Sequence, residues 1–152
     1  MGLYFEELEL GKEYTTASRT VTEADLVIYS GLSGDYNPLH TDEEYSKKTP
    51  YGTRIAHGPL IFAMAMGLVN RLGLTDGTSL GFLSVENWRF IAPVKIGDTI
   101  TVRLKITEKR LSSKGGRGIL KRTVTVLNQR GETTQEGTMV TMVMARTPAP
   151  TP

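Results

Sequence analysis

Hydrophobic and polar positions follow two patterns along this chain, with a helical spacing before Gly77 and an alternating spacing after it. Residues 59–72 form the most apolar helical segment, and apolar side chains cover most of its circumference. Pro59 suits the first helical position, and Gly58 suits the residue just before it. The sequence therefore predicts a core helix that is buried on several sides.

Two shorter helices are predicted upstream from their capping residues. Thr22 suits an N-cap, acidic residues follow in the first turn, and this helix should end near residues 31–34. Thr41 and Glu44 have the spacing of a capping box, which predicts a short helix from there to about residue 48. Both helices precede the buried one.

Alternation is clearest at residues 100–107, where apolar residues occupy the even positions and polar residues the odd ones. Turn signals occur at 112–116 and 128–131. Further strands are predicted at 13–21, 80–90, 118–128 and 132–144. Four successive strands joined by hairpins after the buried helix predict an antiparallel α+β domain, with one long helix on the concave face of its sheet.

Length and composition fit one globular domain. The chain has 152 residues, of which 39% are hydrophobic and 22% are charged. We assign residues 1–146 to a single domain and the proline-rich residues 147–152 to a disordered tail. No apolar stretch approaches ~18 residues, so no membrane partner is expected. The N-terminus lacks a basic segment followed by an apolar run, and we therefore expect a cytoplasmic protein.

Charge and cysteine content narrow the function classes. Cys is absent, which excludes disulfides, cysteine nucleophiles and thiolate metal sites. The net charge of +2 is too small to predict a nucleic-acid partner unless cations cluster. Cations do concentrate around one predicted hairpin, at Lys105, Lys109, Arg110, Lys114, Arg117, Lys121 and Arg122. We interpret them as a solvated face that keeps strand edges soluble. Binding of phosphate groups is the alternative, and no nucleic-acid partner is expected.

Both histidines lie in the irregular stretch before the buried helix. Asp35 precedes His40, and Asn37 and Pro38 between them force a turn that can bring both side chains to one side. A carboxylate and an imidazole that converge in this way could hold one water molecule between them. Such a pair suits general acid–base catalysis, which contributes about 10²- to 10⁴-fold in rate.

The residues before the buried helix form a second candidate element. Free N–H groups and the positive end of the helix dipole lie there. Gly58 lets a substrate carbonyl approach its N–H closely, and one such donor to a developing oxyanion contributes ~3 kcal/mol. An acyl carbonyl is therefore the expected ligand.

Each element alone also has a purely structural interpretation, as a turn or as a helix cap. His57 is interpreted as a hydrogen-bonded structural residue beside Gly58. A metal site is disfavoured because His40 and His57 are not paired on one helix and no thiolate is available, so no metal is expected. Trp88 and Phe90 are interpreted as core or interface residues.

A family resemblance favours the functional interpretation of both elements over the structural one. Residues 29–40, YSGLSGDYNPLH, followed after five residues by Ser46, resemble the hydratase 2 motif of the MaoC-like, (R)-specific enoyl-CoA hydratases. The segments 55–58 and 88–98 resemble the helix-entry and later strand-and-turn segments of that family. The resemblance covers roughly 23–144 and implies a hot-dog fold, an antiparallel sheet wrapped around a long central helix. It also implies a dimer whose acyl tunnel lies at the interface.

The resemblance implies roles for residues of both elements. Asp35 and His40 would hold and activate the water, and the Gly58 N–H would polarise the thioester carbonyl. Asn37, Pro38 and His57 would support the loop or the substrate.

The reaction implied by the resemblance is reversible hydration of a trans-2-enoyl thioester to the (R)-3-hydroxyacyl thioester, a hydro-lyase activity that needs no cofactor. The implied partners are an acyl-CoA or acyl carrier protein thioester and further copies of the chain, in a homodimer or a higher homo-oligomer of dimers. A thioesterase on the same fold and a non-catalytic acyl-thioester-binding subunit remain as alternatives.

Overall fold

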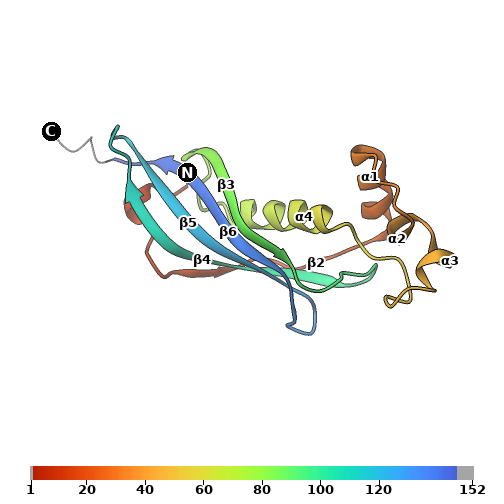
Figure 1. Ribbon diagram of the computed structural model, residues 1–152. Helices are drawn as coiled ribbons and strands as arrows, with labels where there is room; N and C mark the ends of the chain where they lie inside the picture. The colour runs from red at the N-terminus through yellow and green to blue at the C-terminus, as the bar shows by residue number, and fades with distance from the viewer. Residues whose placement is uncertain (1, 147–152) are drawn as a thin grey trace.

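An antiparallel sheet and one long helix dominate the computed structural model, which describes residues 2–146 (Figure 1). The predicted tail at 147–152 lies outside the described residues. In chain order the elements are η1 (Phe5–Glu7), β1 (Glu13–Thr15), β2 (Arg19–Thr20), α1 (Glu23–Ser33), α2 (Pro38–Thr41), α3 (Glu43–Ser46), α4 (Gly58–Asn70), β3 (Ser79–Phe90), β4 (Thr99–Leu111), β5 (Arg117–Leu127) and β6 (Thr133–Met144).

The sheet has the strand order β1-β4-β5-β6-β3, and β2 also pairs with β4. All of these pairings are antiparallel, as the alternating pattern predicted. The strands β4, β5 and β6 follow one another through hairpins, whereas β3 forms an edge and, among the described residues, pairs with β6 alone. Gly131, in the second hairpin turn, has a φ of 77°, which only glycine adopts at little cost.

The prediction of one strand at 13–21 is wrong, because β1 and β2 are separate. Both pair with β4, at Arg103–Lys105 and at Thr99–Ile100. Between them the hydroxyl of Thr16 accepts a hydrogen bond from the Val102 N–H at 3.0 Å. A side chain thus replaces a backbone partner at this point, and the regular ladder is interrupted.

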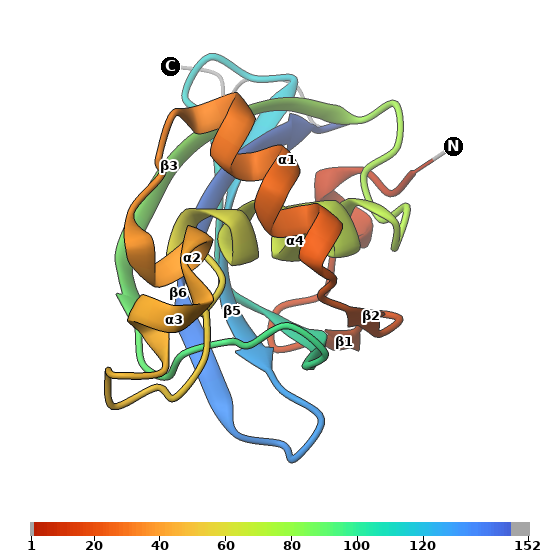
Figure 2. The same ribbon diagram turned by 90° about the vertical axis from the view of Figure 1, so that its right-hand side faces the viewer.

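The core lies between α4 and the inner face of the sheet, and Figure 2 shows α4 crossing that face. The predicted helix at 59–72 is confirmed, although it begins at Gly58 and ends at Asn70. Its buried side chains are Leu60, Ile61, Met64, Ala65, Leu68 and Val69. Burial around most of the circumference is not observed, since Ala63 and Gly67 are exposed. In this single chain, one stripe of α4 therefore faces away from the core.

The helices α1, α2 and α3 gather beyond the N-terminal end of α4 (Figure 1). The predicted start of α1 is confirmed, because Asp25 accepts a hydrogen bond from the Thr22 N–H at 2.9 Å and completes a capping box. Its predicted end is also confirmed, at Gly34 with a φ of 75°. Thr41, by contrast, is not the cap of the next helix. It ends α2, and Asp42 caps α3 by accepting from the Tyr45 N–H at 2.9 Å.

The cations of the β4–β5 hairpin do not all face solvent. Lys121 is paired with Glu86 and Glu108, but the next residue, Arg122, is only 8% exposed. Successive residues of a strand point to opposite faces of the sheet. The interpretation of this cluster as a solvated face is therefore wrong for Arg122, which points inward with Leu120 and Val124.

No helix among residues 2–146 combines the length and the apolar character needed to cross a membrane.

Candidate active site

The turn predicted between Asp35 and His40 is held by its own side chains. The Asp35 carboxylate accepts a hydrogen bond from the Asn37 N–H at 3.2 Å. The Asn37 side chain in turn accepts from the Leu39 N–H at 3.0 Å and caps α2, in which Pro38 takes the first position. His40 lies in this short helix, and its N–H donates to the Asn37 carbonyl at 2.9 Å. The loop sequence itself thus orients His40.

The ring of His40 is fixed by a backbone carbonyl. Its Nδ1 lies 2.7 Å from the Ile55 oxygen. A carbonyl oxygen can only accept, so Nδ1 carries the proton and the lone pair of the neutral ring is at Nε2. His40 is half-buried. The structure therefore leaves one basic nitrogen of His40 available for chemistry.

His57 is buried directly beside His40. Its Nε2 lies 3.1 Å from the Asp35 carbonyl oxygen and 3.3 Å from the Ser30 hydroxyl. The proton of the neutral ring is therefore on Nε2, and Nδ1 is buried without a hydrogen-bond partner in the described part of the chain. Burial lowers the pKa of His57 below its ordinary value. The ring is thus a neutral, packed group at neutral pH.

Asp35, His40 and His57 each offer a ligand atom, and these three atoms lie within 4.8 Å of one another. Such a set has the composition of a metal site. However, the two imidazole planes are stacked, with centroids 3.8 Å apart and an interplanar angle of 30°. His40 Nδ1 and His57 Nε2 already donate to backbone carbonyls, and the remaining lone pair of His57, at Nδ1, is buried. The geometry favours acid–base chemistry over metal binding.

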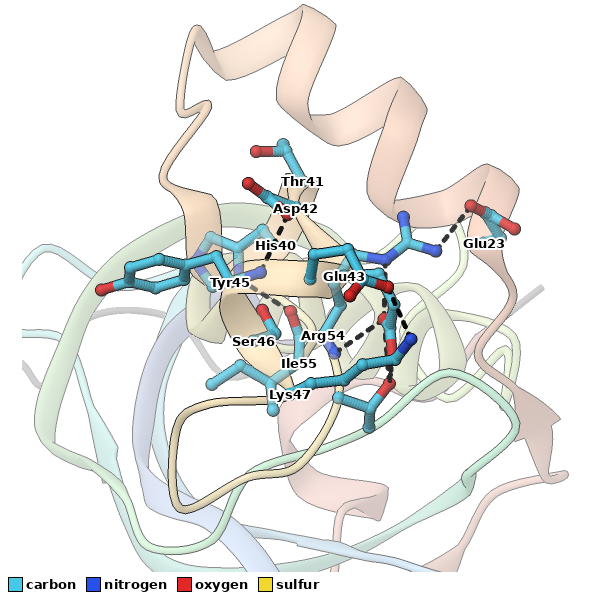
Figure 3. A network of polar contacts seen from close by, with 12 residues as sticks. Glu23, His40, Thr41, Asp42, Glu43, Tyr45, Ser46, Lys47, Arg54 and Ile55 are labelled. Carbon is cyan, nitrogen blue, oxygen red and sulfur yellow. Dashed lines mark hydrogen bonds and ion pairs between the residues drawn. The ribbon is translucent and has the colours of Figure 1, made fainter.

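Arg54 ties the segment beside His40 to two helices (Figure 3). Its guanidinium contacts Glu23 of α1 at 2.7 Å and Glu43 of α3 at 3.2 Å. Hydrogen bonds from Thr53 and Arg54 lower the pKa of the Glu43 carboxyl. The residue that follows, Ile55, supplies the carbonyl that orients His40. Arg54 therefore holds in place the segment whose Ile55 carbonyl orients the His40 ring.

The N-terminal end of α4 presents a backbone donor. The His57 carbonyl accepts from the Ile61 N–H at 3.2 Å inside the helix. Because a trans peptide directs its N–H opposite to its carbonyl, the Gly58 N–H points out of the helix end. The Gly58 carbonyl accepts from the Gln135 side chain at 2.9 Å. A Cβ at position 58 would lie 2.7 Å from the Phe90 ring, so only glycine fits without displacement.

One pocket of about 420 Å³ connects these elements. His40 and Gly58 both line it, whereas Asp35 and His57 do not. The remaining lining residues are Tyr51, Ile55, Ala56, Pro59, Ile61, Phe90, Ile91, Ala92, Pro93, Val94 and Gln135. Most of these side chains are apolar, which suits an acyl group next to a few polar atoms.

Sequence reasoning missed part of this lining. Tyr51 and Gln135 come from a loop and from β6, and neither is marked by a motif. Phe90, read as core or interface, is 60% exposed and forms a pocket wall. Trp88 packs against the core and donates to Gln135 at 3.0 Å. The resemblance at 88–98 was the available signal for this wall.

The basic β4–β5 hairpin lies far from this pocket within one chain. Its turn is at the end of the sheet opposite α2 and α3 (Figure 1). A contact of these cations with coenzyme A phosphates would therefore need a second copy of the chain.

A curled antiparallel sheet around one long helix, with an acyl-sized pocket at the helix N-terminus, is the hot-dog architecture. A Mycobacterium tuberculosis protein described as a double hot-dog fold has the same fold, with a TM-score of 0.84 at 19% identity over 99% of this chain and 46% of that one. The family model for the MaoC like domain matches residues 6–128, and the chain belongs to this family.

Individual relatives agree with this assignment. The (R)-specific enoyl-CoA hydratase of Rhodospirillum rubrum is 37% identical over 105 residues, which are 68% of this chain and 69% of that protein. Protein MaoC of Klebsiella aerogenes is 41% identical over 70% of this chain, but the match spans only 31% of that longer protein. A solved structure described as a monoamine oxidase regulatory protein of Archaeoglobus fulgius has a TM-score of 0.89 at 33% identity, with 95% of both chains covered.

Proposed function

We propose that this chain catalyses the reversible hydration of trans-2-enoyl thioesters to (R)-3-hydroxyacyl thioesters. The observation that carries the proposal is a single pocket lined by an imidazole, His40, and by the N-terminal end of a helix at Gly58. The 37% identical relative named as an (R)-specific enoyl-CoA hydratase supports the reaction class. The substrate carrier is coenzyme A or acyl carrier protein.

In this proposal His40 is the base. Its Nδ1 donates to the Ile55 carbonyl, so Nε2 can accept a proton from water. The Asp35 carboxylate belongs to the group of ligand atoms within 4.8 Å of one another. One water molecule can bridge two acceptors at such a separation, because each hydrogen bond spans about 2.8 Å. Asp35 does not itself line the pocket, so the water that it and His40 would fix in position and orientation would have to lie between Asp35 and the pocket face of His40.

Gly58 supplies the electrophilic side of the reaction. Its N–H leaves the helix end without an intrahelical acceptor, and the helix dipole adds positive potential there. Negative charge that develops on the thioester oxygen is stabilised by such a donor by about 3 kcal/mol. The next residue, Pro59, has no N–H, so Gly58 supplies the only backbone donor of this pair of residues.

The proposed steps balance without a cofactor. The water oxygen bonds to the β-carbon while His40 takes one proton from that water. The electron pair of the carbon–carbon double bond moves toward the α-carbon and the thioester oxygen, which faces Gly58. The proton held at the catalytic pair then passes to the α-carbon, and the product contains all atoms of water and of the enoyl thioester. The reverse sequence is dehydration.

A thioesterase would use the same oxyanion donor but a different water position. It requires water aimed at the carbonyl carbon, next to Gly58 itself. In the proposed arrangement Asp35 and His40 hold the water at a separate part of the site, which suits attack on the β-carbon. The two reactions therefore differ in a measurable product.

The experiment that tests the proposal follows two signals with short and medium trans-2-enoyl-CoA esters. Loss of the conjugated double bond without release of free thiol is expected. Thiol release without loss of the double bond would identify a thioesterase instead. Neither signal, with tight binding of the ester, would identify an acyl-thioester-binding subunit.

We further propose that two copies of the chain form a homodimer. The edge strand β3 and its end expose apolar side chains at Leu80, Phe82, Leu83, Val85, Phe90 and Ile91. A contiguous apolar edge of this kind is typical of an interface. The chain matches only 46% of a relative described as a double hot-dog fold, which supports pairing of two such domains. Phe90 and Ile91 also line the pocket, so a second copy would help to enclose it.

A further inference from the structure

The inner face of β5 carries a buried charge that the proposed reaction does not use. Arg122 lies between Leu120 and Val124 on that face and is only 8% exposed. Its Nε is buried without a hydrogen-bond partner, and no ion pair of its guanidinium occurs among residues 2–146. A buried N–H of a charged group without a partner is costly, because the lost hydration is not replaced.

Arg122 opens into a cavity at the C-terminal end of α4. This cavity has a volume of about 320 Å³. Its other lining residues are Val69, Asn70, Leu74, Thr75, Asp76, Gly77 and Ser79. None of them lines the catalytic pocket. Helix α4 separates the two sites, since twelve residues at about 1.5 Å each place Asn70 roughly 18 Å from Gly58.

The surroundings of Arg122 do not neutralise its charge. Asp76 lines the same cavity, but no contact joins its carboxylate to the guanidinium within the described chain. Desolvation is the one influence on the pKa of Arg122, which it lowers. Glu86 and Glu108 are bound to Lys121 on the opposite face of the sheet. The C-terminal carbonyls of α4 offset only a part of the charge.

We propose that this cavity binds a small free monocarboxylate, paired with the guanidinium of Arg122. A planar guanidinium binds a carboxylate through two parallel hydrogen bonds, which no single hydroxyl or carbonyl reproduces. Asn70, Thr75 and Ser79 add polar side chains around the same space. Asp76 lines the same cavity, and its negative charge opposes a dianion such as phosphate more strongly than a monocarboxylate.

The test measures thermal unfolding of the full chain in sodium acetate and in sodium chloride at equal ionic strength. For a millimolar dissociation constant, roughly 100 mM acetate raises the Tm of the wild-type protein by about 5–10 °C over chloride. Arg122→Met abolishes this shift. The control Arg110→Met removes an exposed cation from the neighbouring strand and keeps the shift. Isothermal titration shows acetate binding to the wild type and to Arg110→Met, and none to Arg122→Met.

A second measurement keeps the result independent of folding defects. Replacing an unpaired buried charge by an apolar side chain of similar volume is neutral or stabilising. In chloride alone, Arg122→Met therefore unfolds at the same or a higher temperature than the wild type. If Arg122→Met does not fold, Arg122→Lys keeps the charge without the planar fork, and its acetate shift is at most half that of the wild type.

Four results would overturn the proposal. If acetate does not change the Tm of the wild type, or shifts the Tm of Arg122→Met equally, the proposed site does not exist. A larger shift with inorganic phosphate than with acetate contradicts a monocarboxylate. Loss of the dimer on Arg122→Met, with no acetate effect in the wild type, assigns the guanidinium to a contact between copies instead.

Discussion

The imidazole of His57 lies against that of His40, with ring centroids 3.8 Å apart and planes inclined by 30°. Burial lowers the pKa of His57, and the positive charge of a protonated His40 lowers it further. A protonated His57 would therefore be unfavourable beside the ring of His40. His57 therefore packs against His40 as a neutral ring.

The first prediction concerns the acid–base pair. Asp35→Asn and His40→Ala are each expected to lower the hydration rate by about 10²- to 10⁴-fold, because general acid–base catalysis contributes that much. Steady-state rates with a trans-2-enoyl-CoA ester measure the effect. Glu44→Gln, in the neighbouring helix α3, removes an exposed carboxylate and should leave the rate unchanged. Near-normal turnover in either site variant, with a native circular dichroism spectrum, would show that its residue has another role.

The second prediction concerns pH and stability. Because the folded pKa of His57 is lowered, the unfolded chain binds a proton that the folded chain refuses as pH falls below about 6.5. Stability is therefore lost on acidification, by at most about 1.4 kcal/mol per pH unit from this group. In His57→Gln this contribution is absent, so the free energy of unfolding depends less on pH. Urea titrations at pH 8, 7, 6 and 5 measure the difference, and parallel curves would contradict it.

The third prediction concerns the helix entry. In Gly58→Ala the new methyl group would lie 2.7 Å from the Phe90 ring, so this ring, which is 60% exposed, must shift, and a small loss of Tm is expected. The same methyl group fills space in front of the proposed oxyanion donor, so hydration should also fall. Adding Phe90→Ala removes the clash and should restore the Tm without restoring the rate. Recovery of both properties in the double variant would mean that the activity loss came from misfolding alone.

The fourth prediction concerns Arg54 as a positioning residue. Arg54→Met releases Glu23 and Glu43 and loosens the segment whose Ile55 carbonyl orients His40. The kcat for hydration is expected to fall about tenfold while KM changes little, because orientation and not binding is impaired.

Lys47→Met is the matched control for Arg54→Met. Lys47 pairs with Glu44 on the surface and has no link to Ile55, so its loss should leave kcat unchanged. A rise in KM at constant kcat in Arg54→Met would instead indicate a direct contact with substrate.

The fifth prediction concerns assembly. Leu83 is 46% exposed on β3, and Leu83→Lys should convert the proposed dimer to a monomer by placing a charge at its apolar interface. Leu111→Lys, at a position 38% exposed on β4, should leave the mass unchanged. Light scattering measures both. A wild-type chain that is monomeric at micromolar concentration would contradict the assembly.

The two longer helices, α1 and α4, were predictable from residues within or next to them. The caps at Thr22 and Gly34 bound α1, and the apolar run after Gly58 forms α4, because capping and hydrophobic spacing act over a few residues. The division of β1 from β2 was not predictable in this way. It depends on the hydroxyl of Thr16 meeting Val102, a contact 86 positions away along the chain.

The site was predictable to the extent that its residues share a motif. Asp35, His40 and Gly58 are marked by the turn and the helix start, whereas Gln135 reaches Gly58 from β6 and has no signal of its own. The burial of Arg122 was also predictable, from the alternating pattern of its strand. The alternation of β5 puts position 122 on the apolar face, but counting it among neighbouring cations suggested a solvated position.

The register between β3 and β6 shifts at three places, after Ser79, after Phe82 and after Glu86. Asn87, at the last of these shifts, has a φ of 52°. An exposed apolar edge would otherwise be a template for open-ended, fibril-like growth by backbone pairing. Repeated irregularities bend the edge and prevent a long flat ladder from forming. The same strand can thus offer side chains to one partner while it resists amyloid-type aggregation.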